Sequence, residues 1–185
     1  SATDDGGHAS APSGRYTLAK AHGYIAFTYV HQGYSTPFLR WRDWDATLDW
    51  DAANPEASSV SVVINAAEVD SGVDEFDGHL RGETFFDTDN YPQITFNSTA
   101  VNMTSDTTGT ITGDLTIKDE THPVTLNVTF NKAGYSDRSN MHKLGFSATA
   151  DVNRSTWGVD RAVPNVSDEV NLIIEAEFMM PGDAE

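Results

Sequence analysis

The sequence has no cysteine among its 185 residues, and it has few basic residues: 11 lysines and arginines against 28 aspartates and glutamates. The absence of cysteine excludes disulfides, thiolate nucleophiles, zinc ribbons and iron–sulfur clusters. The formal net charge of −17 excludes the class of nucleic-acid-binding proteins, because these need a basic surface to neutralise phosphates. The same charge predicts repulsion from an anionic membrane surface.

Long apolar runs are also missing. No run approaches the roughly 18 residues that span a bilayer, so we expect no stable membrane insertion. The first residues, SATDDGGHASAPSG, lack the basic region and apolar core of a signal peptide. We expect residues 1–13 to form a flexible linker or tail, residues 14–180 to form one β-domain and residues 181–185 to form a C-terminal tail.

Motifs for catalysis and metal binding are absent as well. The chain has no GxSxG nucleophile elbow and no glycine-rich phosphate loop. The histidines lie in separate segments without the spacing of a metal site, and the acidic segment 70–78 does not match a calcium loop. We therefore expect no enzyme activity, no catalytic cofactor and no metal.

What the chain does have is alternation of apolar and polar residues. Because successive side chains of a strand point to opposite faces, each stretch predicts a strand with one apolar face. Eight such stretches occur, at Ile25–Val30, Trp44–Asp49, Val60–Asn65, Ile94–Asn97, Leu115–Lys118, Val124–Phe130, Phe146–Val152 and Val170–Phe178. Turn signals such as Asn54-Pro55 separate them, which favours an antiparallel all-β fold.

Eight strands can close into a barrel that holds side chains or one small ligand, and a β-sandwich has the same pattern. Segment 73–92 does not alternate, and it predicts one or two short helices that cap one end of the sheet structure. The apolar faces are explained by a filled core or by a ligand cavity. Small residues in the inward set (Ala46, Ala148, Ala150 and Ala176) favour a cavity.

Several ordered strings give the chain a family resemblance. They are Asp70-Ser71-Gly72, His79-Leu80-Arg81, Phe85-Phe86-Asp87, Tyr91-Pro92, the Ile94/Phe96/Ser98 strand, the hairpin from Gly113 to Leu126, Asn153 to Gly158, and Val166 to Val170. In this order they resemble the YceI-like polyisoprenoid-binding family over roughly Arg15 to Phe178. The resemblance implies an extended eight-stranded antiparallel barrel, similar to lipocalins, with a long apolar tunnel.

The resemblance also implies a ligand and a location. Members of the family bind isoprenoid chains, including polyprenyl tails of quinone or alcohol type, and are usually periplasmic or secreted bacterial proteins. We therefore expect non-catalytic binding of a long isoprenoid, such as a ubiquinone-like lipid, for carriage, storage or sensing. The sequence leaves the oligomeric state open, a dimer included.

We expect the tunnel wall to combine the inward strand residues with the helical insert, and the lipid head group to lie at the aromatic loop from Tyr34 to Trp44. A neutral quinone head suits this acidic protein better than a phosphate, which would need Arg40 or Arg42. Arg81 is expected to pair with a neighbouring carboxylate and anchor the insert. The residues expected to contact ligand are Ile25, Phe27, His31, Tyr34, Trp41, Trp44, Leu48, Val62, Ile64, Phe76, Leu80, Phe85, Phe86, Phe96, Leu115, Ile117, Leu126, Val128, Phe146, Ala148, Leu172 and Ile174.

Two further function classes stay open. The first is a structural or interaction β-domain with a filled core, appended to a secreted multidomain enzyme through the N-terminal linker. The second is a hydrolase with a histidine and carboxylates at the barrel mouth. A bound lipid would favour the isoprenoid-binding hypothesis over both.

Overall fold

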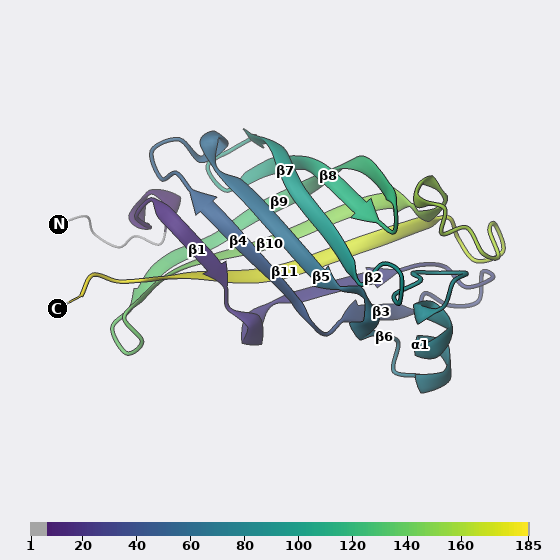
Figure 1. Cartoon of the computed structure of the whole chain (residues 1–185). Coiled ribbons are helices and arrows are strands. Elements are labelled where there is room, and N and C mark those ends of the chain that lie inside the picture. The colour runs from purple at the N-terminus through teal and green to yellow at the C-terminus, as the bar shows by residue number, and fades with distance from the viewer. Residues whose placement is uncertain (1–6, 185) are drawn as a thin grey trace.

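The structure of the protein, a computed structural model, describes residues 7–184. Eight antiparallel strands close into a barrel in the order β1-β4-β5-β7-β8-β9-β10-β11, and β1 closes it by pairing with β11 (Figure 1). The predicted eight-stranded lipocalin-like barrel is confirmed. Its strands are β1 Gly14–Leu18, β4 Trp44–Trp50, β5 Ser59–Asn65, β7 Gln93–Met103, β8 Thr108–Ile117, β9 Glu120–Ser136, β10 Met141–Asn153 and β11 Glu169–Pro181.

Three further strands extend the sheet at one end of the barrel. β2 (Tyr24–Thr28) follows β1 along the same edge of β11, β3 (Phe38–Trp41) pairs with β2, and β6 (Val69–Asp70) pairs with β3. The stretch predicted at Ile25 is therefore β2, whereas β1 and β3 were not predicted. Each is too short to show more than two apolar alternations.

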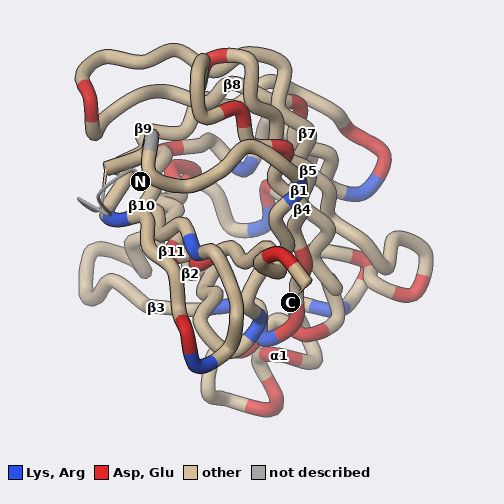
Figure 2. The backbone as a smooth tube through the Cα atoms, turned by 90° about the vertical axis from the view of Figure 1, so that its left-hand side faces the viewer, with Lys and Arg blue, Asp and Glu red and all other residues tan. Residues whose placement is uncertain are grey.

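Strand β4 shows how the sequence pattern builds the core. Trp44, Ala46, Leu48 and Trp50 alternate with polar residues, and all four are buried on the inner face of the barrel. The charged Asp45 and Asp49 point outward to solvent. Figure 2 shows the charged positions spread over the loops and strands around the barrel. Burial of the apolar face contributes about 25 cal/mol per Å² removed from water, which is what fixes the register of the strand.

One α-helix, α1 (Asp74–Arg81), lies at the end of the barrel opposite the N-terminal segment (Figure 1). Its first turn is acidic, which suits the positive end of the helix dipole, and Asp77 accepts a hydrogen bond from the Ser71 backbone N–H at 2.7 Å. The remaining described helices are short 3-10 turns at His8–Ser10, Lys20–His22, Pro55–Ala57, Ala66–Glu68 and Arg154–Trp157.

Arg81 differs from the prediction. Its side chain is exposed and takes part in none of the ion pairs among the described residues. The insert is held instead through the Arg81 backbone, whose carbonyl accepts a hydrogen bond from the Thr88 N–H at 3.0 Å. An exposed ion pair would have contributed little, because water screens it.

The N-terminal segment is more ordered than its composition predicts. Ala11 is 1% exposed, and its carbonyl accepts a hydrogen bond from the Trp50 indole at 3.3 Å. The Ser13 hydroxyl accepts the Ala52 N–H at 2.8 Å. These long-range contacts join the end of the expected linker to the barrel, and the rest of that prediction, residues 1–6, lies outside the described residues. At the other terminus, β11 runs to Pro181, the first residue of the expected tail.

Tyr16 anchors this N-terminal segment and gives a pH-dependent prediction. It is fully buried, its hydroxyl donates to the Pro12 carbonyl at 2.7 Å, and burial raises the pKa of its phenol to about 12. The unfolded chain ionises this phenol near pH 10, whereas the folded protein keeps it neutral until about pH 12. The neutral phenol's contribution to stability is therefore complete below pH 10 and is lost as the pH rises from 10 through 12. A Tyr16→Phe variant should lose about 1 kcal/mol of unfolding free energy at pH 7.

Urea unfolding between pH 8 and pH 12 checks this prediction. The wild-type protein should lose about 2–3 kcal/mol more over this range than Tyr16→Phe does, because only the wild type has this phenol to ionise. Parallel stability profiles for the two proteins would contradict it.

Candidate ligand-binding cavity

The barrel interior is hollow. A cavity of about 770 Å³ runs through it, a size within the usual range for small-molecule sites. Every strand of the closed barrel except β1 contributes to the wall, and so do β2, β3 and the α1 insert. The expectation of a filled, purely structural core is therefore not supported.

The alternation of the strands decides which side chains reach the cavity. Several inner-face residues, such as Val62, Phe146 and Leu172, are only partly buried although they point inward, because their exposed surface faces the cavity. Of the predicted contact residues, the following line the cavity: Ile25, Phe27, His31, Trp41, Trp44, Leu48, Val62, Ile64, Phe76, Leu80, Phe85, Phe86, Phe96, Leu115, Ile117, Leu126, Val128, Phe146, Ala148, Leu172 and Ile174. That they bind a ligand stays a prediction.

Tyr34 is the exception. Its side chain is 86% exposed and does not contribute to the wall. The reason is a tight turn between His31 and Ser35, in which Gln32 and Gly33 adopt positive φ and the chain projects away from the barrel. The predicted aromatic loop is also not one loop, since β3 occupies its second half and carries Trp41 to the inner face.

The small inward residues divide in the same way. Ala148 and Ala176 line the cavity, whereas Ala46 and Ala150 are buried but do not reach it. Because Ala148 and Ala176 have small side chains, they leave room in the cavity.

At the end of the barrel beside α1 the cavity reaches the surface. Phe76, Leu80 and Phe86 of the insert lie on the wall, and they are at most partly exposed. Phe38 and Val73 also line the cavity, yet they are 62% and 57% exposed. Residues that touch both the cavity and solvent show where the cavity reaches the surface, and one such place lies between β3 and the start of α1.

Several wall residues were not among the predicted contacts. Trp50 and Phe130 continue the alternation of their strands by one step, a signal that the sequence already carried. Trp157 lies in a 3-10 turn without alternation, and it is buried by an indole hydrogen bond to the Leu115 carbonyl at 2.9 Å. His8 lines the opposite end, edge-on to Trp50 and Phe130 at ring-centroid distances of 6.2 and 6.1 Å.

The polar groups on the wall are few and mostly engaged. Burial lowers the pKa of the Arg154 guanidinium, and its donors are used by loop carbonyls. Burial also raises the pKa of Tyr29, an effect that the nearby Arg154 charge opposes. Arg40 and Arg42, the expected partners of a phosphate head, do not line the cavity: Arg40 lies over the outward ring of Tyr24 and Arg42 lies beside Asp70.

The described residues contain no cluster of metal-ligating side chains. None of the described helices is long and apolar enough to cross a bilayer. What the interior provides is apolar surface with a few isolated polar atoms, an arrangement suited to enclosing a hydrocarbon ligand.

Comparison with known proteins identifies the family. A sequence profile of the YceI-like domain matches residues 16–178. This chain belongs to the YceI-like domain family. A UPF0312 protein of Ectopseudomonas mendocina is 34% identical to it over 172 residues, which are 93% of this chain and 90% of the relative.

Solved structures agree with the barrel of this YceI-like domain. BcnA of Burkholderia cenocepacia superposes with a TM-score of 0.79 at 24% identity, over 86% of this chain and 98% of BcnA. A polyisoprenoid binding domain from Saccharophagus degradans, implicated in plant cell wall breakdown, superposes with a TM-score of 0.66 at 12% identity, over 92% of this chain and all of that domain. At these identities the likeness shows the shared fold.

The strings that carried the resemblance have structural roles in this chain. Asp70 accepts the Gly72 N–H at 2.8 Å in the turn before α1, and Gly72 has a φ of 82°. Arg154 ties the segment after β10 to the loop 159–167, Trp157 ties it to strand β8 through the Leu115 carbonyl, and Gly158 ends that turn with a φ of 74°. These parts of the family pattern therefore mark positions that shape the segments around α1 and after β10.

Proposed function

We propose that this YceI-like domain binds a long isoprenoid lipid without chemical change, for carriage, storage or sensing. The observation that carries the proposal is the cavity of about 770 Å³, whose wall is almost entirely hydrocarbon and which opens beside α1. A related fold described as a polyisoprenoid binding domain supports the ligand class. We propose a periplasmic or secreted location on the family resemblance.

The physical basis is the transfer of an insoluble chain from water into an apolar tube. Burial contributes about 0.8 kcal/mol per CH₂, so each isoprene unit contributes about 3–4 kcal/mol before the entropic cost of ordering the chain. A few units suffice for tight binding, and affinity then levels off well below the sum. A charged wall would oppose this transfer, and the engaged Arg154 donors leave little free charge inside.

The polar end of the lipid belongs at the α1 end of the cavity, where His31 and Trp41 lie on the wall. A neutral quinone head is favoured over a phosphate. The chain carries a net charge of −17, and neither Arg40 nor Arg42 reaches the cavity. Arg161 is the exposed cationic residue on the wall that a phosphate would use.

Native mass spectrometry of the purified protein tests the proposed function. We expect an added mass that organic extraction removes and that is identified as an isoprenoid. Delipidated protein should then take up a polyprenyl quinone to one molecule per chain. A protein that shows no added mass and takes up no isoprenoid would contradict the proposal.

Competition between a polyprenyl quinone and a polyprenyl phosphate of equal chain length tests the head group. The quinone should bind more tightly, and Arg161→Ala should leave that preference unchanged. A preference for the phosphate that Arg161→Ala abolishes would overturn the assignment of a neutral head while leaving isoprenoid binding intact.

A further inference from the structure

The four tryptophans of the chain all line the cavity, yet their indole N–H groups fall into two pairs. Trp50 donates to the Ala11 carbonyl at 3.3 Å and Trp157 donates to the Leu115 carbonyl at 2.9 Å. The Nε1 atoms of Trp41 and Trp44 are buried and have no hydrogen-bond partner among residues 7–184.

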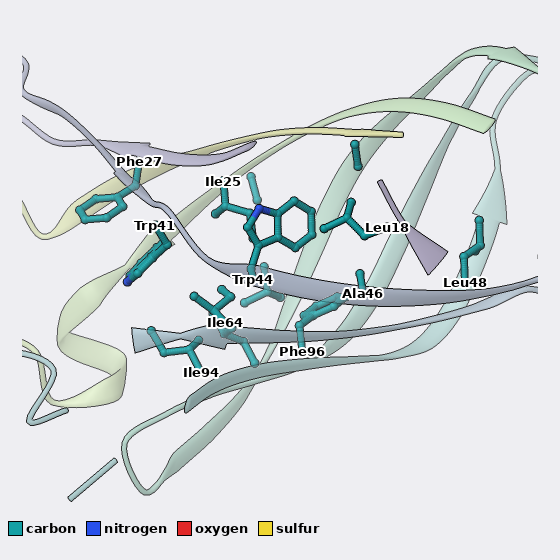
Figure 3. Packing of buried hydrophobic residues seen from close by; sticks show 14 of the residues in the cluster. Leu18, Ile25, Phe27, Trp41, Trp44, Ala46, Leu48, Ile64, Ile94 and Phe96 are labelled. Atoms are coloured by element: carbon teal, nitrogen blue, oxygen red, sulfur yellow. The ribbon is translucent and has the colours of Figure 1, made fainter. Parts of the chain in front are cut away.

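The two unpaired indoles occupy one section of the barrel. Trp41 is at the end of β3 and pairs with Ile25 of β2. Trp44 is at the start of β4 and pairs with Ile64 of β5. Figure 3 shows both rings among aliphatic and aromatic side chains on the inner side of the strands. The Trp41 ring centroid lies 4.7 Å from that of Phe27 and 5.4 Å from that of Phe86. This surrounding offers no acceptor to either nitrogen.

Such a pair of donors is energetically unfavourable by itself. Indole Nε1–H is a donor only, and a buried donor without a partner costs about 1–3 kcal/mol. A phenylalanine would fill most of the same space without that cost. Trp41 and Trp44 are 6% and 5% exposed, so bulk solvent does not satisfy them. Two such groups on the wall of one cavity point to an acceptor that enters with the ligand.

We propose that the Trp41 and Trp44 indoles donate hydrogen bonds to carbonyl oxygen at the polar end of the bound lipid. The proposal rests on the proposed function and narrows its ligand class to isoprenoids with a ketone or quinone head. A carbonyl accepts hydrogen bonds and brings no donor of its own. An alcohol would bring a hydroxyl proton that the aromatic neighbours of Trp41, Phe27 and Phe86, do not accept, and a phosphate would bring charge into an apolar section.

Indole NMR of the ¹⁵N-labelled protein tests the proposal with controls inside the molecule. The probes are a benzoquinone with a short polyprenyl tail and squalene, an isoprenoid hydrocarbon without a head. The quinone should move the indole proton resonances of Trp41 and Trp44 downfield, as hydrogen bonding does, and squalene should not. The resonance of Trp157 should move little with either probe, because its donor is already bonded to Leu115.

Affinity measurements on three variants give a second readout. Trp41→Phe and Trp44→Phe should each weaken quinone binding by about 3- to 10-fold and leave squalene binding unchanged, the loss expected for one hydrogen bond. Neither change should reduce folding stability through a lost hydrogen bond, because the indole N–H groups of Trp41 and Trp44 donate none to the described part of the chain. Trp50→Phe is the matched control: it removes a bonded indole from the same wall, so it should lower stability and affect both probes alike.

The outcomes separate this proposal from the proposed function. If the quinone and squalene bind but shift all four indoles alike, or if Trp41→Phe and Trp44→Phe weaken both probes equally, the donor role is overturned and isoprenoid binding stands. If neither probe binds the wild-type protein, the proposed function fails and this proposal fails with it.

Discussion

Replacing Ala148 with tryptophan should reduce isoprenoid uptake by about tenfold or more while the barrel still folds. Ala148 lies in β10 between Val128 of β9 and Ile174 of β11, and its side chain faces the cavity. An indole at this position would occupy the space that the lipid chain needs. Because it enters an open volume rather than a packed core, we expect a loss of unfolding free energy of only about 1–3 kcal/mol.

A matched variant on the other face of the same strand controls for the added bulk. Thr149 is exposed and points away from the cavity, so Thr149→Trp should leave uptake unchanged. Uptake of a polyprenyl quinone by delipidated protein, together with urea unfolding, measures both effects. Equal uptake by Ala148→Trp and the wild type would show that the chain does not pass this point of the cavity.

The sequence predicted the middle of the barrel well, because a two-residue period is a local property. Leu172 and Ile174 of β11 face inward, and the strand register pairs them with Phe27 and Ile25 of β2. The paired residues therefore face inward as well. One face of each strand must be buried, so a slip by one residue would expose the whole apolar set. The wall of the cavity follows from the same alternation.

The ends of the barrel were predicted poorly, because distant contacts decide them. Ala11 is buried through an indole 39 residues away, which no local pattern of serine, alanine and glycine reveals. Strand β3 lies within a segment whose aromatic residues suggested a loop, and pairing with β2 makes it a strand. Tyr34 has an aromatic ring and a polar hydroxyl, as many ligand-contacting residues do, but a positive-φ turn directs its side chain to solvent.

The same limit applies to the indole donors. Whether a tryptophan N–H is paired depends on a carbonyl far along the chain, such as Leu115 for Trp157, 42 residues away. The sequence therefore identified Trp41 and Trp44 as apolar bodies with polar tips, but it did not show that their tips lack partners. Trp50 and Trp157 therefore have paired indole N–H groups and structural roles, whereas Trp41 and Trp44 have N–H groups that are unpaired within the described residues and can bind an acceptor on a ligand.

The segment 159–167, which forms part of the wall, depends on one side chain. The Arg154 guanidinium donates to the carbonyl oxygens of Ser167 at 2.9 Å, Val159 at 2.8 Å, Arg161 at 2.8 Å and Val166 at 2.9 Å. Hydrogen bonds from a charged donor contribute more than neutral ones, and removing the donor leaves every acceptor to be satisfied by water. We therefore expect Arg154 to hold this loop in place.

Arg154→Met, which keeps the aliphatic stem, should lower the free energy of unfolding by about 1.5–3 kcal/mol, the range for hydrogen bonds made by a charged group, because Arg154 is partly buried and its partners are neutral carbonyls. Arg154→Lys should recover less than half of this loss, because an ammonium group lacks the planar fork that reaches several carbonyls at once. Urea unfolding measures both variants, and hydrogen exchange should show early opening at Val166 and Ser167. Arg161→Met is the control, since its exposed side chain donates none of these bonds. Arg154→Met with wild-type stability and exchange would mean that the loop is held by its own turns and by its pairing with residues 30–32, and not by the guanidinium.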